Sequence, residues 1–413
     1  MRSGALDHVT VELDAAELSG PVDIGVLHRT KAAGGSIVGF AYSDEWLARK
    51  DPFPIDPLHG LYPGDQWPRD GKIDRIFTDA APDRWGRTLL SRQEAHAATT
   101  EKRRRRMLDE WDYLLGISDV SRMGALRLRA PDGRYVDDAD EVPPMTRLPD
   151  LVTAVREIES PSHDHRRQAL SLALLLAPGS SLGGARPKAS FLAQDGSLWM
   201  AKFPSRTDTR DMAACEWVLN ELAAGAGIEV PEHRLLEVGT GQHSFLARRF
   251  DRAGGSRRLY ASAMTLLSRR DREDASYLDI ALAIADHGER SAIGAELAAM
   301  FRRVVFNVLT AHRDDHLRNH GFLRRGAGWL LAPAFDLNPM PDMPEHTLAI
   351  DAVDHIGDID LVLSTAEFYR LSSAQAGAIV DEVRAALVGW ERTAQSAKLG
   401  PDEMDTIAEA LGD

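Results

Sequence analysis

Short apolar runs, interrupted by glycine and proline, characterise the first fifty residues of the chain. The clearest are residues 22–27 and 36–42, in which β-branched residues are frequent, a composition typical of strands. Two later runs, residues 189–193 and 198–203, flank an Asp-Gly pair, which favours a tight hairpin turn. The pattern therefore predicts a small β-rich subdomain at the N-terminus and a β-hairpin further along the chain.

Patterns typical of helices begin in the middle of the chain and dominate its second half. We expect helices over residues 151–177 and 212–224, and a pair of strands near residues 234–249. Beyond Gly255 the strand patterns largely disappear, and apolar residues recur at the spacing of one helix face. The clearest such face consists of Phe301, Val304, Val305 and Val308.

A β-rich half followed by a helical half predicts an α+β fold with two lobes. Residues 130–149 are rich in Asp and Pro, which is typical of a linker. We therefore expect an N-terminal subdomain over residues 1–147, a small lobe over residues 148–254 and an all-helical large lobe over residues 255–413.

The composition is that of an ordinary globular protein. Of the 413 residues, 44% are hydrophobic and 27% are charged, which suffices for two or three domains with sizeable cores. We find no apolar run long enough to cross a membrane and no N-terminal secretory signal. The single cysteine, Cys215, excludes an internal disulfide and suits a reducing cytoplasm. The net charge of −14 argues against unaided binding to nucleic acid but suits a basic protein partner.

The most informative motif is the stretch from His312 to Asn319, which reads H-R-D-x-x-x-x-N. Kinases that phosphorylate hydroxyl groups carry this pattern in their catalytic loop. The chemistry sets the spacing, because Asp314 would accept the proton of the hydroxyl while Asn319 would hold a magnesium ion beside the nucleotide phosphates. A second metal-binding aspartate should follow, and Asp336 comes after an apolar run. Phosphoryl transfer is therefore the leading interpretation.

A lysine at the end of the predicted hairpin supports this interpretation. Lys202 ends an otherwise apolar strand, where an anion is needed to offset the free energy of burying its charge. In a kinase the nucleotide phosphates provide that anion, and a helix glutamate holds the lysine in place. Glu216 shares a helical stripe with Met212 and Leu219 and is the candidate glutamate. A structural ion pair or an exposed strand end is the alternative for Lys202.

A glycine-rich stretch precedes the hairpin, and residues 179–188 read G-S-S-L-G-G-A-R-P-K. Glycines let backbone amides approach a phosphate closely, and Arg186 and Lys188 add positive charge. The stretch is neither a Walker A loop nor the G-x-G-x-x-G loop of protein kinases. It therefore predicts either a phosphate-binding loop or an ordinary glycine-rich turn.

The density of His and Asp around the H-R-D pattern leaves a second interpretation open. Metal-dependent phosphohydrolases hold ions with such clusters, although here the order of the adjacent His-Asp pair is reversed and no second cluster is obvious nearby. A solvated polar loop is a third possibility, and a regulatory subunit without catalysis is a fourth. The residues concerned are His312, Asp314, Asp315, His316, Asn319 and His320.

Taken in order, these motifs resemble the HipA family of bacterial serine/threonine kinases, the toxin components of HipBA-type toxin–antitoxin modules. The resemblance covers nearly the whole chain. Its motifs are the glycine-rich loop at residues 181–188, the lysine strand at 200–204, the hinge at 245–252, the D-x-H-x-x-N pattern at 314–319 and the Phe-Asp pair at 335–336.

The resemblance implies a fold of HipA type, with a β-rich N-terminal subdomain and a kinase small lobe followed by an all-helical large lobe. It implies ATP and Mg²⁺ as cofactors, with Asp314 as the catalytic base and Asn319 and Asp336 as the magnesium ligands. The hinge would meet adenine through backbone groups, and the loop and lysine strand would meet the phosphates. The implied nucleotide-binding residues are Gly183, Gly184, Ala185, Arg186, Lys188, Lys202, Glu216, Arg248, Phe250, His316, Asn319 and Asp336.

The resemblance also implies a cytoplasmic location, protein partners and regulation by phosphorylation. Ser181, with Ser180 as the nearest alternative, would be an autophosphorylation site whose modification silences the enzyme. A HipB-like helix-turn-helix antitoxin would neutralise the toxin, and DNA would be met only through this antitoxin. The family's protein substrates include aminoacyl-tRNA synthetases, notably glutamyl-tRNA synthetase.

Overall fold

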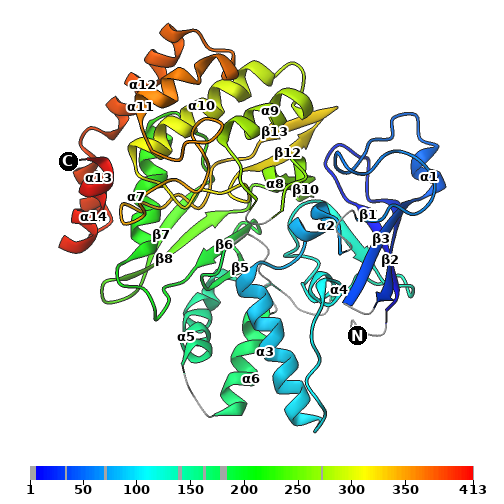
Figure 1. The fold of residues 1–413 in the computed structure, drawn as a ribbon. Coiled ribbons are helices and arrows are strands. Elements are labelled where there is room, and N and C mark those ends of the chain that lie inside the picture. The colour runs from blue at the N-terminus through cyan, green and yellow to red at the C-terminus, as the bar shows by residue number, and fades with distance from the viewer. Residues whose placement is uncertain are drawn as a thin grey trace. The chain divides into compact units, whose positions relative to one another are not determined.

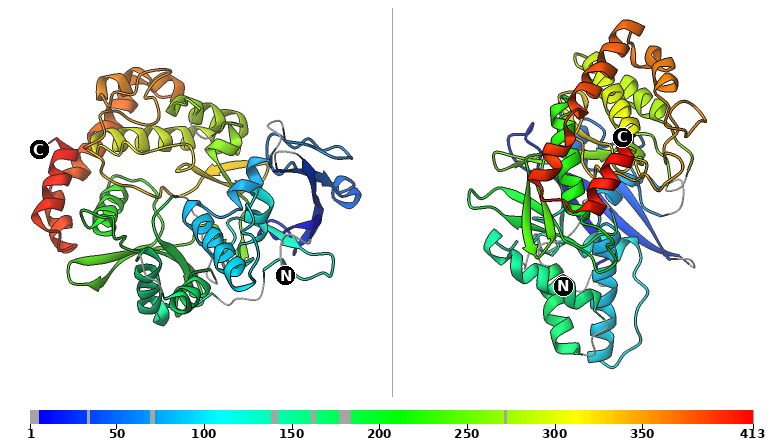
Figure 2. Two further views of the ribbon diagram at one scale, coloured as in Figure 1. Left: turned by 60° about the horizontal axis from the view of Figure 1, so that its bottom comes forward. Right: turned by 90° about the vertical axis from the view of Figure 1, so that its left-hand side faces the viewer.

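The computed structural model describes residues 6–32, 35–68, 72–137, 142–160, 164–176, 184–270 and 273–412. The chain forms two compact units (Figures 1 and 2). The first comprises residues 1–206 and 251–261, and the second comprises residues 207–250 and 262–413. The expected division at residues 147 and 254 stays a proposal.

A four-stranded antiparallel sheet lies in the first unit, with its strands in the order β3-β2-β1-β4. The predicted N-terminal runs form β2 and β3, so this expectation is confirmed. Val9, Val11 and Leu13 of β1 are fully buried, as period-two alternation requires for a sheet with one face on the core. The strands are β1 (His8–Leu13), β2 (Val22–Ala32), β3 (Gly35–Tyr42) and β4 (Leu126–Arg129).

Helices α3, α5 and α6 of the first unit lie side by side (Figures 1 and 2). The helix expected over residues 151–177 is instead two helices, and α5 ends at the residue before Ser160. Pro161 follows Ser160, and a residue before proline is disfavoured in helical geometry. The helices are α1 (Asp44–Leu47), α2 (Arg75–Asp79), α3 (Arg84–Thr100), α4 (Glu110–Leu115), η2 (Met145–Arg147), α5 (Leu148–Glu159) and α6 (His165–Leu176).

The predicted hairpin is present as the antiparallel strands β5 (Lys188–Leu192) and β6 (Leu198–Lys202). Gly196 in its turn has a φ of +77°, a conformation that favours glycine. The register places Lys188 directly opposite Lys202, so both side chains leave the same face of the hairpin. Two short strands, β9 (Arg252–Ala253) and β10 (Ser256–Arg257), complete the first unit.

A buried charge network ties residues 251–257 to the rest of the first unit. Asp119 Oδ2 accepts hydrogen bonds from Arg127 Nη2 at 2.6 Å and from Arg257 Nη2 at 2.9 Å. Burial would raise the pKa of Asp119, but the two guanidinium groups outweigh it and lower the pKa. Asp251 Oδ2 accepts from the Gly124 backbone amide at 2.8 Å. The segment that follows the predicted hinge is therefore fixed by charge as well as by packing.

The second unit is rich in helices, which pack around α10. Phe301, Val304 and Val305 of α10 are fully buried and Val308 is half-buried, so the predicted apolar face is confirmed. No described helix is long and apolar enough to cross a membrane. The helices are α7 (Met212–Gly225), α8 (Ala263–Leu266), α9 (Tyr277–His287), α10 (Ile293–Leu309), α11 (Ile359–Ser364), η3 (Ala366–Tyr369), α12 (Ser373–Leu387), α13 (Trp390–Ser396) and α14 (Pro401–Leu411).

The α+β class predicted from the sequence is confirmed, with one correction. The C-terminal region is not all-helical, because β12 (Gly321–Arg325) and β13 (Gly328–Leu331) form an antiparallel hairpin after residues 312–320. The hairpin is anchored by four buried side chains, those of Phe322, Leu323, Trp329 and Leu331. The sequence did not predict it, because runs this short fall below the length at which periodicity separates strand from helix. The other strands are the expected pair β7 (His233–Gly239) and β8 (Gln242–Arg248), and β11 (Tyr260–Ser262).

A buried histidine in the first unit is held between two carboxylates. His59 Nδ1 lies 2.8 Å from Asp56 Oδ1, and its Nε2 lies 3.1 Å from Asp74 Oδ2. The ring packs edge-on against Phe40 and Phe77. Burial alone would lower the pKa of His59, but the hydrogen bond and charges of the two carboxylates outweigh it and raise the pKa to about 9.

We expect this histidine to make the stability of the first unit fall in alkaline solution. Because folding raises the pKa of His59 from 6.5 to about 9, its contribution is complete below pH 6.5 and is lost as the pH rises through 9. The amount lost is about 3 kcal/mol. In urea unfolding, the free energy of unfolding of His59→Gln should depend less on pH than that of the wild type. His8 is exposed, so His8→Gln should show the same pH dependence as the wild type. Equal pH dependence in His59→Gln and wild type would show that the buried ring is uncharged.

Candidate active site

Residues 312–320, here called the catalytic loop, connect α10 to β12 in the second unit. Arg313 fixes this loop to the segment that follows β13. Its Nη1 donates to the carbonyl oxygens of Pro341, at 2.8 Å, and Met343, and its own carbonyl accepts from the Thr347 amide at 2.8 Å. The loop therefore has a defined course although it contains neither helix nor strand.

The two adjacent aspartates of the loop have opposite environments. Asp314 is exposed, whereas the side chain of Asp315 is 2% exposed. Among the residues that the structure describes, no side chain forms a hydrogen bond or ion pair with the Asp314 carboxylate. Asn319 is buried, and its Nδ2 lies 3.4 Å from the Asp314 carbonyl oxygen. The turn between them is closed by the Asn319 amide, which donates to the His316 carbonyl at 2.8 Å.

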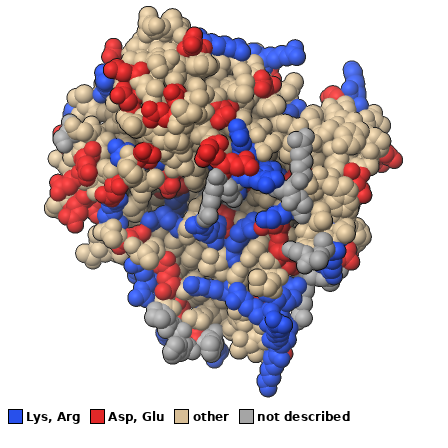
Figure 3. Space-filling view, in the orientation of Figure 1, with Lys and Arg blue, Asp and Glu red and all other residues tan. Residues whose placement is uncertain are grey.

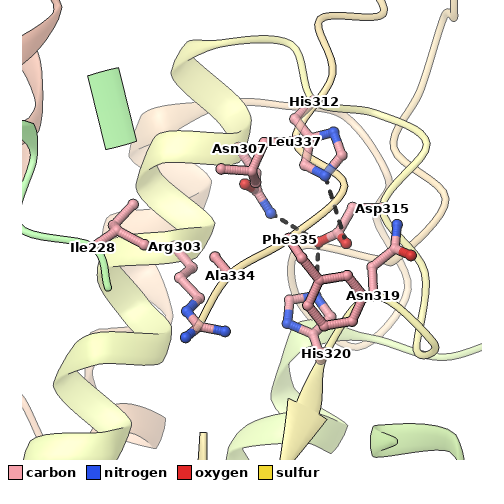
Figure 4. A pocket seen from close by; sticks show the side chains of 10 residues that line it. All are labelled: Ile228, Arg303, Asn307, His312, Asp315, Asn319, His320, Ala334, Phe335 and Leu337. Carbon is pink, nitrogen blue, oxygen red and sulfur yellow. Dashed lines mark hydrogen bonds and ion pairs between the residues drawn. The ribbon is translucent and has the colours of Figure 1, made fainter. Parts of the chain in front are cut away.

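Asp315 accepts hydrogen bonds from three side chains, of which Figure 4 draws Asn307 and His320. Its Oδ2 lies 2.9 Å from Tyr277 Oη, 2.8 Å from Asn307 Nδ2 and 2.7 Å from His320 Nε2. Its Oδ1 lies 3.7 Å from His312 Nε2. Burial would raise the pKa of Asp315, but the two imidazoles and the hydrogen bonds outweigh it and hold the pKa well below its ordinary value.

Asp336 lies in the segment after β13, in a strained backbone conformation. Its φ is +63°, a left-handed value that is uncommon for residues other than glycine and gathers at functional sites. The preceding Phe335 stacks on Phe250, with ring centroids 5.5 Å apart. His312 Nδ1 lies 2.9 Å from the Asn338 carbonyl oxygen. The segment of Asp336 is thus held both by the predicted hinge and by the catalytic loop.

A small pocket lies where the catalytic loop and the Asp336 segment meet (Figure 4). Asn319 lines it from the loop, and Phe335 lines it from the segment. The guanidinium of Arg303 reaches it from α10 and donates to the Ala332 carbonyl oxygen at 2.6 Å. The residues that line the pocket are Ile228, Arg303, Asn307, His312, Asp315, Asn319, His320, Ala334, Phe335 and Leu337.

The predicted phosphate-loop residues lie in the first unit, and Lys188 has an unexpected partner there. Lys188 Nζ lies 2.8 Å from Asp83 Oδ2, and the two side chains are 2% and 3% exposed. Asp83 is also the N-cap of α3 and accepts from the Gly86 amide at 2.8 Å. The lysine that was expected to contact ATP phosphates is thus held at a helix N-terminus, where a carboxylate is favoured.

Other predicted residues lie around this hairpin or outside the described residues. Gly184 has a φ of +88°, and a Cβ atom there would lie 3.1 Å from Lys188 Nζ. Ala185 and Arg186 follow it, and Lys202 is buried at the end of β6. Ser180, Ser181 and Gly183 lie outside the described residues.

Three further predicted nucleotide-binding residues lie in the second unit. Glu216 is buried on α7, as its place on the apolar stripe predicted. The Arg248 amide donates to the Glu232 carbonyl at 2.8 Å, and its side chain lies 3.3 Å from the Glu232 carboxylate. Phe250 is half-buried, and its ring stacks on that of Phe335. Lys202 belongs to the first unit and Glu216 to the second, so their predicted pairing stays a proposal.

The polar cluster of the catalytic loop is a hydrogen-bond network around a carboxylate. Within the described ranges, no group of three or more His, Cys, Asp or Glu side chains is placed to hold a metal ion. His320 is directed at Asp315, and His312 is directed at Asn338. This geometry favours the kinase interpretation over the hydrolase alternative. Sequence reasoning missed Asp83, Tyr277 and Asn307, of which only Asp83 carries a local signal, because a proline followed by an acidic residue is typical of the start of a helix.

The residues present suit Mg²⁺ with ATP. Asn319 directs its amide nitrogen at the Asp314 carbonyl, which leaves its side-chain oxygen for another partner. Asp336 adds a carboxylate from a strained position. Carboxylate and amide oxygens are the hard ligands that magnesium prefers beside nucleotide phosphates.

An α+β fold with an exposed aspartate followed by a buried asparagine in one loop defines a phosphotransferase of the protein-kinase type. The model of the HipA-like C-terminal domain matches residues 180–391, just over half of the chain. The chain therefore belongs to the HipA-like family of serine/threonine kinases, which confirms the predicted resemblance. Kinases of this family use ATP.

Comparison with solved structures agrees on the fold. HipA from a Shewanella oneidensis MR-1 structure, described as a complex of HipA, HipB and operator DNA, has a TM-score of 0.68 and 15% sequence identity. The match covers 98% of this chain and 96% of that one. The Helicobacter pylori proinflammatory kinase CtkA matches with a TM-score of 0.33 and 15% identity, over 51% of this chain and 94% of that one, which is too weak to support an argument. No curated protein sequence matches significantly.

The buried Lys188–Asp83 pair makes a prediction about stability. Lys188→Met should destabilise the first unit by about 3 kcal/mol, because it leaves the Asp83 carboxylate buried without its cation. Asp83→Asn combined with Lys188→Met should cost less than Lys188→Met alone, since asparagine still caps α3 and no charge is left unpaired. Thermal unfolding of the two variants and of the wild type measures this. A rise in the KM for ATP without any loss of stability would assign Lys188 to the nucleotide instead.

Proposed function

We propose that this chain is a magnesium-dependent serine/threonine protein kinase and the toxin of a HipBA-type toxin–antitoxin module. The observation that carries the proposal is the contrast within the catalytic loop, where Asp314 is exposed while Asp315 and Asn319 are buried. A catalytic base must reach a hydroxyl on another protein, whereas the residues that position it and the metal need fixed places.

In this proposal Asp314 acts on the acceptor hydroxyl. Its carboxylate accepts the proton of a serine or threonine side chain and orients the oxygen for attack. Asn319 and Asp336 would hold magnesium through their side-chain oxygens. ATP would supply the γ-phosphoryl group, whose bond to the β-phosphate breaks so that ADP leaves, and magnesium would supply positive charge that offsets the negative charge of the phosphate oxygens.

The remaining nucleotide contacts are assigned from the same family pattern. The backbones of Arg248 and Phe250 would contact adenine, and the stack of Phe250 on Phe335 supports this because it joins the hinge to the magnesium segment. Lys202 would contact the phosphates, with Glu216 as its partner. The pairing of Lys188 with Asp83 makes Lys202 the better candidate of the two opposed lysines for this role.

The proposed partner is a HipB-like helix-turn-helix antitoxin, and DNA would be met only through it. The structurally similar Shewanella HipA was solved with HipB and operator DNA, which supports the proposal by analogy of fold. Acidic side chains gather over α12 to α14 (Figure 3), and the chain carries a net charge of −14. A DNA-binding antitoxin must be basic towards DNA, so charge favours the association.

The acceptor would be a hydroxyl of a cytoplasmic protein. Aminoacyl-tRNA synthetases, with glutamyl-tRNA synthetase as the first to test, are the acceptors that the family resemblance suggests. Phosphoproteomics after brief induction of the chain in its native host would identify the acceptor directly.

We expect Asp314→Asn to abolish transfer while leaving nucleotide binding intact. The base acts on the hydroxyl and does not hold ATP, so kcat should fall about a thousandfold while the Kd for ATP stays near the wild-type value. Asp336→Asn should weaken both phosphate transfer and ATP binding, since it removes a proposed magnesium ligand. Transfer of labelled phosphate and calorimetric binding measure the two effects. Release of free phosphate without labelled protein would support the hydrolase alternative.

We expect autophosphorylation at Ser181 to silence the enzyme. A phosphate adds about −1.5 to −2 charge at pH 7, which would repel the phosphates of ATP and compete for Arg186. After incubation with Mg-ATP, peptide mapping should find phosphate at Ser181, and the modified protein should bind ATP poorly. Ser181→Ala should stay able to bind ATP, and Ser180→Ala is the matched control. Active enzyme without phosphate in residues 179–188 would contradict this regulation but not the kinase assignment.

A further inference from the structure

The buried carboxylate of Asp315 has three side-chain hydrogen-bond partners beside the candidate active site, and the proposed reaction gives it no role. Its three donors come from different elements: Tyr277 from the start of α9, Asn307 from α10 and His320 from the residue before β12. The carboxylate therefore joins two helices and the end of the catalytic loop, next to β12, to the middle of the loop, where Asp315 itself lies.

A second link runs from Asp315 to the segment of Asp336. The Nε2 atom of His312 lies 3.7 Å from Asp315 Oδ1, and the Nδ1 atom of the same ring lies 2.9 Å from the Asn338 carbonyl oxygen. Asn338 in turn donates from Nδ2 to the Asp336 carbonyl at 3.1 Å. The His312 ring thus lies between the buried carboxylate, at more than hydrogen-bond distance, and the backbone that sets the place of the second proposed metal-binding residue.

The burial of Asp315 also determines the directions in which the neighbouring side chains of the loop point. Successive side chains leave a loop backbone in different directions, so a buried Asp315 leaves Asp314 turned to solvent, as observed. Asn319 follows after a turn closed by its own amide. Loss of the anchor would allow the base and the metal ligand to shift together, and a displacement of about 1 Å at such groups costs on the order of a hundredfold in rate.

We infer that Asp315 is a positioning residue of the proposed phosphotransfer reaction, which sets Asp314, Asn319 and Asp336 in place without touching substrate or nucleotide. The inference rests on the proposed function. An ordinary buried polar cluster would explain stability alone, so the test must separate stability from catalysis.

An exchange of amide and carboxylate provides this separation. Asn307 Nδ2 lies 2.8 Å from Asp315 Oδ2 and 3.2 Å from Tyr277 Oη. In the double variant Asp315→Asn with Asn307→Asp, one carboxylate and one amide remain in the cluster, and the carboxylate still has an amide and the Tyr277 hydroxyl as donors. The charge, however, now belongs to α10 and no longer to the catalytic loop.

For Asp315→Asn we expect a lower Tm, a kcat reduced about a hundredfold and a smaller change in the KM for ATP. The Mg²⁺ concentration needed for half-maximal activity should rise about 10- to 100-fold, the usual effect of removing a partner of a metal ligand. Calorimetry of ADP binding with and without Mg²⁺ gives a readout that does not depend on turnover. The magnesium-dependent part of the affinity should shrink, while the magnesium-independent part should stay.

In the exchanged double variant we expect Tm to recover and kcat to stay low. Recovery of both would overturn the inference, since the carboxylate would then act only through stability. The matched control is Asp211→Asn, which removes a largely buried carboxylate that pairs with His243 at 2.6 Å in the same unit. It should lower Tm with kcat unchanged.

Should the exchange fail to restore Tm, Asp315→Asn is compared directly with Asp211→Asn, each below its own unfolding transition. Equal kcat per folded molecule in these two variants would overturn the inference, and a selective loss in Asp315→Asn supports it. Wild-type protein without transfer to any protein would instead refute the proposed function, and normal transfer by Asp315→Asn would refute the positioning role alone.

Discussion

The carboxylate of Asp315 is the point at which helices α9 and α10 meet the catalytic loop, which leads directly into the β12–β13 hairpin. A buried charge without partners would destabilise the second unit by several kcal/mol, so the surrounding elements must each present a donor to it. Tyr277, Asn307 and His320 do so at 2.7–2.9 Å. The place of these three elements is therefore tied to one side chain, and the neighbouring Asp314 takes its exposure from the same constraint.

The first unit uses the same principle at other sites. Lys188 and Lys202 lie opposite each other in the β5–β6 hairpin, where like charges repel, and Asp83 compensates one of them at the N-terminus of α3. His59 is compensated by two carboxylates, and Asp119 by two arginines. Each of these clusters joins segments that are distant in sequence, so buried ion pairs fix the geometry of loops that lack regular secondary structure.

The kinase assignment is consistent with this use of buried charge. Phosphoryl transfer requires one carboxylate that is free to meet a substrate and others that hold metal or backbone in place. In the proposed reaction the chain would meet both demands with neighbouring residues of the same type, because the fold buries Asp315 and leaves Asp314 in solvent. The family match over residues 180–391 and the HipA-like fold agree with this arrangement.

The sequence by itself determined the α+β class, the strand pairs β2–β3, β5–β6 and β7–β8, helix α7, the apolar face of α10 and the kinase-type motif of the catalytic loop, because these depend on local composition and on spacing along the chain. It did not determine which of two identical aspartates is buried, since that depends on donors from α9, from α10 and from the end of the catalytic loop. The partner of Lys188 was missed for a similar reason, because Asp83 lies more than a hundred residues away. The short hairpin after the catalytic loop was missed because its strands are too brief for a periodic signal. Local order is encoded in local sequence, whereas burial and pairing of charge are decided only when distant segments pack together.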